Sequence, residues 1–184
     1  MKYLLALSTI LSLAFTPLAA EKAAKQIEAK ELELVVSYAN SLFSEDCNQF
    51  KDAFSYVQFN KKYQIDDHLI YEILCRAAAY NGFSRWFKQS SDGSFTPVYF
   101  SMPNLEKNSS GQFIIAGFRD ENELVNSEFD YQSQTVISVN KWIGSGEASE
   151  RTEWEFQDGS FVFSKYLVDE TYDGKVNPIL VEEE

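Results

Sequence analysis

Asp-Gly pairs between short alternating apolar runs are the feature that most constrains the fold of this chain. They occur at Asp92-Gly93 and Asp158-Gly159, and a third, Asp173-Gly174, precedes a final apolar segment. Such a pair joins antiparallel strands because both central residues of the turn must accept positive φ angles. The flanking runs span residues 83–89 and 95–102 at the first pair and 151–157 and 160–168 at the second. Successive hairpins predict a mostly antiparallel sheet or sandwich.

The first part of the chain predicts a helix and then a central strand. Between about residues 21 and 43, apolar residues recur at three- and four-residue steps, as on one face of a helix. From His68 to Cys75 both alternating faces are largely apolar, which predicts a strand covered on both sides. We expect a loop at 103–110 and a short helix or loop at 119–126. The predicted fold is α+β and β-rich, with the N-terminal helix packed on a β-rich part over about 68–181.

The N-terminus predicts export. Lys2 precedes an uncharged segment from Leu4 to Phe15, and small residues end at Ala20, which is the pattern of a secretory signal peptide. The apolar segment is shorter than the roughly 20 residues of a membrane-spanning helix, and a buried N-terminal helix is the alternative. We therefore expect a signal peptide at 1–20, a single globular domain at 21–184, and a periplasmic or secreted bacterial protein with no membrane span in its mature chain.

The net charge restricts the partners. A formal charge of −12 argues against nucleic acid, because phosphate binding needs a concentrated basic face. An acidic chain suits a basic protein or peptide through electrostatic complementarity. Solubility of an exported domain explains the same charge without any partner.

The two cysteines, Cys47 and Cys75, both fall in the predicted exported part. An even number of cysteines in an oxidising compartment favours a disulfide. Such a bond stabilises the fold by roughly 3–4 kcal/mol on the chain-entropy model. Two free buried thiols or a redox pair are the alternatives, although a redox pair normally has the spacing Cys-x-x-Cys.

No reactive centre stands out in the sequence. His68 is the single histidine, no Gly-x-Ser-x-Gly motif accompanies it, and no glycine-rich phosphate loop is present. The 28 acidic residues make accidental carboxylate pairs unavoidable, so such pairs carry little information. Tryptophans 86, 142 and 154 are of the type that lines sugar- or peptide-binding faces, although aromatic residues in strands usually belong to the core. We predict no catalytic, cofactor-binding or metal-binding residues and no cofactor.

Two groups of motifs in this chain are distinctive. The first group comprises Leu74-Cys75, the segment 78–81 (Ala-Ala-Tyr-Asn), the aromatic run 83–87, Asp92-Gly93 and the segment 98–103. The second comprises Lys141 with the Gly-rich segment that follows it, and the segment 154–161 (Trp-Glu-Phe-Gln-Asp-Gly-Ser-Phe). Both groups resemble a family of exported bacterial proteins known as domain of unknown function 1176. The resemblance implies export and a β-rich fold, and it brings no catalytic residues because the family has no assigned activity.

The chain departs from the family pattern at three places. Arg76 stands where members usually have an aromatic residue, and two further cysteines, near 146–148 and 170–174, are absent. Their joint loss implies that they pair with each other in the family, which leaves Cys75 to pair with Cys47. The candidate surface binding residues are Arg76, Tyr80, Asn81 and Trp142.

These observations predict an exported, non-enzymatic binding or envelope-associated accessory protein of unknown ligand. One alternative is an inhibitor of a cationic envelope enzyme such as a lysozyme, which depends only on the net charge. The other is a hydrolase that uses paired carboxylates beside an aromatic substrate groove.

Overall fold

The computed structural model of the chain describes residues 25–43, 47 and 59–182. The predicted signal peptide at 1–20 lies outside these residues. The described part contains one helix, α1 (Ala29–Leu42), and its strands all pair antiparallel. No helix in this part is long and apolar enough to cross a membrane.

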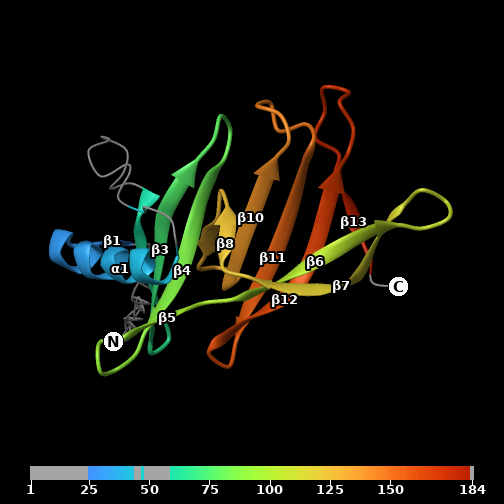
Figure 1. Cartoon of the computed structure of the whole chain (residues 1–184). Helices are drawn as coiled ribbons and strands as arrows, with labels where there is room; N and C mark the ends of the chain where they lie inside the picture. The colour runs from blue at the N-terminus through green and yellow to red at the C-terminus, as the bar shows by residue number, and fades with distance from the viewer. Residues whose placement is uncertain (1–24, 44–46, 48–58, 183–184) are drawn as a thin grey trace, which may run out of the picture.

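The strands form two larger sheets and a separate hairpin (Figure 1). The first sheet has six strands, in the order β1 (Lys25–Gln26), β2 (Lys61–Ile65), β3 (His68–Ala77), β4 (Gly82–Gln89) and β5 (Phe95–Pro97), with β8 (Glu123–Val125) also paired to β4. The second has five, in the order β13 (Ile179–Val181), β12 (Ser160–Asp169), β11 (Ser149–Gln157), β10 (Thr135–Lys141) and β9 (Glu128–Asp130). The hairpin pairs β6 (Phe100–Lys107) with β7 (Phe113–Glu121). The predicted α+β, β-rich fold is confirmed.

The two main Asp-Gly pairs form different turns. Asp158 and Gly159 have φ angles of 49° and 82° and join β11 directly to β12, as a two-residue hairpin requires. Asp92-Gly93 lies in a longer loop in which only the glycine has a positive φ, 85°. The Asp92 carboxylate there accepts hydrogen bonds from the backbone and the hydroxyl of Ser94. Both pairs connect antiparallel strands, as predicted.

Three boundaries differ from the sequence-based expectation. The helix begins at Ala29 and not near residue 21, because residues 25–26 pair with β2 as strand β1. The expected loop at 103–110 is wrong in its first half, since Pro103 to Lys107 belong to β6. Proline fits there because β6 is an edge strand of a two-stranded sheet. Segment 119–126 contains the end of β7 and the short strand β8 and is not helical.

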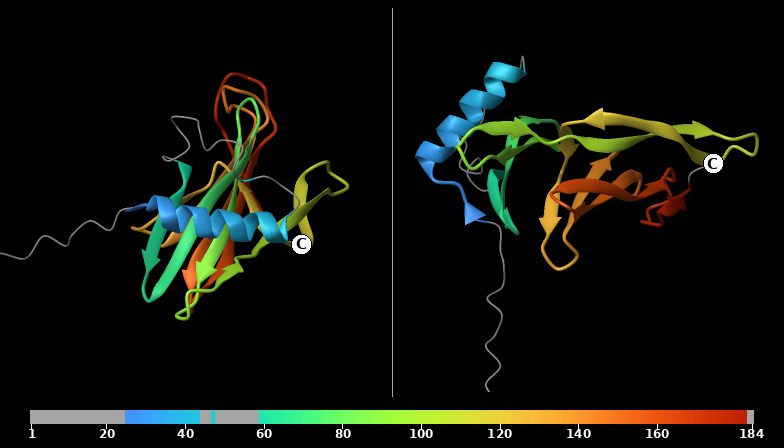
Figure 2. Two further views of the ribbon diagram at one scale, coloured as in Figure 1. Left: turned by 60° about the vertical axis from the view of Figure 1, so that its left-hand side comes forward. Right: turned by 90° about the horizontal axis from the view of Figure 1, so that it is seen from below.

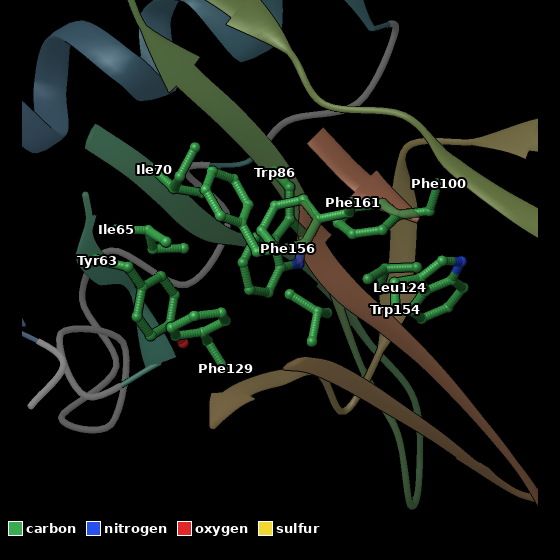
Figure 3. Packing of buried hydrophobic residues seen from close by; sticks show 11 residues of the cluster. Tyr63, Ile65, Ile70, Trp86, Phe100, Leu124, Phe129, Trp154, Phe156 and Phe161 are labelled. Atoms are coloured by element: carbon green, nitrogen blue, oxygen red, sulfur yellow. The ribbon is translucent and has the colours of Figure 1, made fainter. Parts of the chain in front are cut away.

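The first sheet lies between α1 and the second sheet (Figures 1 and 2). Tyr71, Ile73 and Cys75 on β3 pack with α1, whereas Ile70 belongs to the core shared with the second sheet. This confirms a central strand covered on both sides. Aromatic side chains dominate the core between the sheets (Figure 3): it includes Tyr63, Trp86, Phe100, Phe129, Trp154, Phe156 and Phe161. Trp86 and Trp154 are therefore core residues.

Cys47 and Cys75 form a disulfide, as predicted. It joins the chain beyond α1 to the last residues of β3 across a separation of 28 residues. Closing a loop of this length stabilises the fold by about 3–4 kcal/mol on the chain-entropy model. The disulfide fixes the end of β3 that leads into the candidate site.

Candidate functional site

Three connections gather at one end of the two sheets, and they carry most of the predicted site residues. They are 78–81 between β3 and β4, 142–148 between β10 and β11, and 170–178 between β12 and β13 (Figures 1 and 2). A methyl group on Gly144 would lie 2.7 Å from the Tyr80 ring, so this ring rests directly on the 142–148 connection. We call this region the loop end.

Tyr80 and Trp142 keep exposed ring surface at the loop end. Tyr80 is 55% exposed and Trp142 is 36% exposed. Arg76 lies at the end of β3, where its guanidinium stacks on the Phe83 ring at 3.6 Å and pairs with Glu123. These contacts give Arg76 a structural role within the first sheet, and they do not involve Tyr80 or Trp142.

Asn81 connects the two sheets. Its side-chain amide donates to the Asn140 side chain and to the Lys141 carbonyl, both at 3.0 Å. Its carbonyl oxygen accepts from the Lys141 backbone N–H at 3.1 Å and from the Asn126 amide at 2.7 Å. The Asn126 carbonyl oxygen in turn accepts from the Gly82 N–H at 2.8 Å. Asn81 is thus a half-buried connector whose side-chain oxygen and nitrogen both have partners, and it holds the β3–β4 turn against β10.

A pocket of about 430 Å³ opens beside this turn. We call it the Glu72 pocket. The surface of its walls is mainly apolar. The lining residues are Phe59, Lys61, Glu72, Leu74, Ala77, Ala78, Ala79, Tyr80, Asn81, Gly82, Ser84, Asn126 and Ser127. Of the predicted residues, the pocket therefore includes Tyr80 and Asn81.

Glu72 is the most buried charged group at this site. Its side chain is 3% exposed, and it accepts hydrogen bonds from Tyr63 Oη at 2.6 Å and Ser127 Oγ at 2.7 Å. Ser127 Oγ accepts in turn from the Trp86 indole N–H at 3.1 Å. The Lys61 ammonium lies 3.6 Å from Glu72 Oε2, directly across from it on β2. A connected set of donors thus holds the carboxyl group at the floor of the pocket.

Burial raises the pKa of Glu72 above the usual carboxyl value of 4.5. The attraction of Lys61 and the hydrogen bonds from Tyr63, Ser127 and Ser84 act in the opposite direction, but burial outweighs them. Burial, together with the neighbouring Glu72 charge, also raises the pKa of Tyr63, which keeps it a neutral donor. A carboxyl group with a perturbed pKa in a mainly apolar pocket is a common property of ligand sites.

Sequence reasoning missed Glu72 and Lys61. Glu72 interrupts the apolar stretch 69–75, in a strand predicted to be covered on both faces. A charged residue at such a position requires a partner or a function. That interruption is the signal that identifies the site.

A second concave region lies between the β6–β7 hairpin and the two sheets. This acidic groove has a volume of about 380 Å³, and Glu121, Glu123 and Glu150 line it. Each carboxylate has internal partners: Glu150 accepts from Asn140 and Tyr166, Glu123 pairs with two arginines, and Glu121 accepts from backbone N–H groups. These contacts engage the carboxylates of the groove with groups of their own sheet or of the adjacent chain.

The comparison with known families agrees with the motifs. The model of a protein family of unknown function, DUF1176, matches residues 13–175. No curated protein and no solved structure shows significant similarity to the chain. The match extends from ahead of α1 to the β12–β13 connection and so includes the loop end and the Glu72 pocket. The chain therefore belongs to the DUF1176 family.

Proposed function

We propose that this protein is an exported, non-enzymatic binding protein whose ligand occupies the Glu72 pocket. The observation that carries the proposal is the buried, hydrogen-bonded Glu72 at the floor of a mainly apolar pocket of about 430 Å³. This volume lies within the range of about 300–1,000 Å³ that is common for small-molecule sites. The half-exposed Tyr80 ring at the rim adds a large apolar contact at low entropic cost.

Binding accounts for the pocket better than hydrolysis does. Hydrolysis by paired carboxylates needs two acids on either side of the scissile bond, about 5–10 Å apart. Among the described residues that line the pocket, Glu72 is the only acid. The hydroxyl groups of Tyr63 and Ser127 donate to Glu72 and form a buried polar network around it. In the acidic groove, the glutamates are likewise engaged with neighbouring groups.

An inhibitor of a cationic envelope enzyme has weaker support. It draws on the net charge of −12 and on the three glutamates of the acidic groove. Internal arginines already neutralise Glu123 there. The Glu72 pocket therefore remains the favoured site.

A pocket-filling variant tests the binding proposal. Ligand-observed NMR with a set of small carboxylates, amines, alcohols and sugars should find at least one compound that binds the purified mature protein. Ala78→Trp places a large ring at the pocket wall and should abolish that binding. Ala116→Trp, at an exposed alanine on β7, is the matched control and should leave it intact. No binding to the wild type, or equal binding to both variants, would contradict the proposal.

Export has a separate test. Expressed with its N-terminus in a Gram-negative host, the protein should appear in the periplasmic fraction and begin at Glu21. A protein that keeps Met1 and stays in the cytoplasm would remove the export part of the proposal and leave the pocket unaffected.

A further inference from the structure

Lys61 is the polar group of the Glu72 pocket with unused hydrogen-bonding capacity. Its ammonium lies 3.6 Å from Glu72 Oε2, too far for a hydrogen bond, and within the described residues no other acceptor binds it. The side chain is 30% exposed and lines the pocket. An ammonium group carries three donors, so Lys61 offers N–H groups to a ligand.

Apart from the hydroxyl of the half-exposed Tyr80, the other polar groups of the pocket are already occupied. Glu72 accepts from Tyr63 and Ser127, so both of its oxygens have partners. The amides of Asn81 and Asn126 are used in joining the sheets. A ligand therefore meets an unoccupied donor and few unoccupied acceptors.

A cationic ligand fits this arrangement poorly. It would have to approach the Lys61 ammonium, which already supplies the positive charge next to Glu72. Like charges at such a short distance in a partly buried site are unfavourable. An anion instead gains a charge-assisted hydrogen bond from Lys61.

The walls determine the rest of the ligand. Phe59, Leu74, three consecutive alanines at 77–79 and Tyr80 form an apolar surface beside the ammonium. An alkyl or aromatic body buries its surface against these side chains, with a gain of about 25 cal/mol per Å².

Resting on the binding function proposed above, we infer that the ligand of the Glu72 pocket is a small carboxylate with an apolar body, held through the Lys61 ammonium. Lys61 contacts the anionic group, and the apolar walls contact the body. The residue is a ligand-binding group that the family description does not assign.

The binding of an anion here is linked to the uptake of a proton by Glu72. The groups that face Glu72 are Lys61 and Tyr63 on β2, Ser84 on β4 and Ser127 after β8, and Lys61 is the one cation among them. A bound carboxylate competes for Lys61 and repels the Glu72 charge, so it raises the pKa of Glu72 further. Affinity should therefore increase as the pH falls toward the usual carboxyl range.

The experiment uses three probes with one body: octanoate, 1-octanol and octylammonium. Calorimetric titration of the mature protein at pH 6 and pH 8 should show octanoate binding at least tenfold more tightly than either other probe, and more tightly at pH 6. Lys61→Met should weaken octanoate binding tenfold or more, and Lys61→Arg should retain most of it. Lys62→Met is the matched control, because Lys62 pairs with Glu31 and does not line the pocket. Glu72→Gln should make octanoate binding independent of pH.

The outcomes separate this inference from the binding function. Octylammonium or 1-octanol binding as tightly as octanoate, with loss in the Ala78→Trp variant, would overturn the carboxylate inference and support the pocket. Octanoate binding that Lys61→Met leaves unchanged would also overturn it. If octanoate does not bind while a compound of the NMR set without a carboxylate does, the carboxylate inference fails and the binding function stands. If no compound binds, both fail.

Discussion

Two adjacent lysines on β2 lead to two glutamate clusters on opposite faces of one sheet. Each cluster combines a lysine, a tyrosine hydroxyl and a glutamate. The inner cluster, toward the second sheet, is Lys61, Tyr63 and Glu72; the outer cluster, toward α1, is Lys62, Tyr71 and Glu31. The groups are of the same kind, so the two clusters differ mainly in the burial of the carboxyl group and in its distance from the lysine ammonium.

Burial gives the two carboxyl groups opposite behaviour. The Glu72 side chain is 3% exposed, and burial raises its pKa. The Glu31 side chain is 24% exposed. Burial also acts to raise the pKa of Glu31, but the hydrogen bonds from Lys62 and Tyr71 outweigh it, and the pKa is lowered. The inner cluster therefore holds a buried charge that is unfavourable in the folded protein, whereas the outer cluster is an ordinary stabilising ion pair.

Replacing the two lysines should reveal the largest difference in stability between the clusters. Lys61→Met should lower the free energy of unfolding at pH 8 by about 2 kcal/mol, below the usual 3–5 kcal/mol for a buried pair because Lys61 remains partly exposed. Lys62→Met should cost about 0.5–1 kcal/mol. Urea denaturation followed by circular dichroism measures both values.

The double variant Lys61→Met, Glu72→Gln provides the control for this prediction. It should recover most of the stability lost in Lys61→Met, since no buried charge is left without a partner. Equal losses in the two single lysine variants would show that Glu72 is not an unfavourable charge in the folded protein.

Removal of the tyrosine hydroxyls should have an intermediate effect. Tyr63→Phe deletes the 2.6 Å hydrogen bond to a fully buried carboxyl group and should cost about 1.5 kcal/mol at pH 8, the lower end of the range for a hydrogen bond to a charged group, because Ser127 and Ser84 still donate to Glu72. Tyr71→Phe affects a more exposed carboxyl group and should cost about 0.5–1.5 kcal/mol. Thermal unfolding of both variants at one pH checks the order, and a larger loss for Tyr71→Phe would contradict it.

The smallest effect should be the change of folding stability with pH, and it should have opposite signs for Glu72 and Glu31. Because the folded-state pKa of Glu72 is raised, its contribution is most favourable below about 4.5 and becomes less favourable as the pH rises through the folded value. Glu72→Gln should remove this decline above pH 4.5. Because the folded-state pKa of Glu31 is lowered, its contribution is present above 4.5 and lost as the pH falls through the folded value.

Glu31→Gln should therefore lose about 0.5 kcal/mol at neutral pH and show a flatter profile in acid. Urea unfolding of the wild type and both variants between pH 3.5 and pH 8 provides the profiles. Parallel profiles for the two glutamine variants would contradict the difference between the clusters.

The elements that could be predicted are those whose structure is determined by residues within the element itself. The turn at Asp158-Gly159 follows from residues that accept positive φ, and the strand at 69–75 follows from its apolar content. The later part of β6, residues 103–107, and strand β8 were missed because a hairpin edge and a three-residue strand have too little buried surface to impose a clear alternation.

The candidate site could be predicted only in part, because its contacts join distant segments. Tyr80 and Asn81 were identified through family motifs, but the partners of Asn81 lie about 60 residues further along the chain. Lys61 and Glu72 face each other because of the register between β2 and β3, which the polar sequence of residues 60–67 does not reveal. Glu72 itself was visible as a charge within an apolar strand.

The short connection between β2 and β3 has a consequence for how this protein can vary. Ile65 pairs with His68, so two residues, Asp66 and Asp67, span the turn, and Asp66 takes a φ of 49°. Side chains alternate between the faces of a strand. Inserting or deleting one residue here would exchange the faces of Lys61 and Lys62 and would move the cation of the pocket to the helix side. Relatives that keep the pocket should therefore keep this two-residue length, with a residue that accepts a positive φ, such as Asp, Asn or Gly, at position 66.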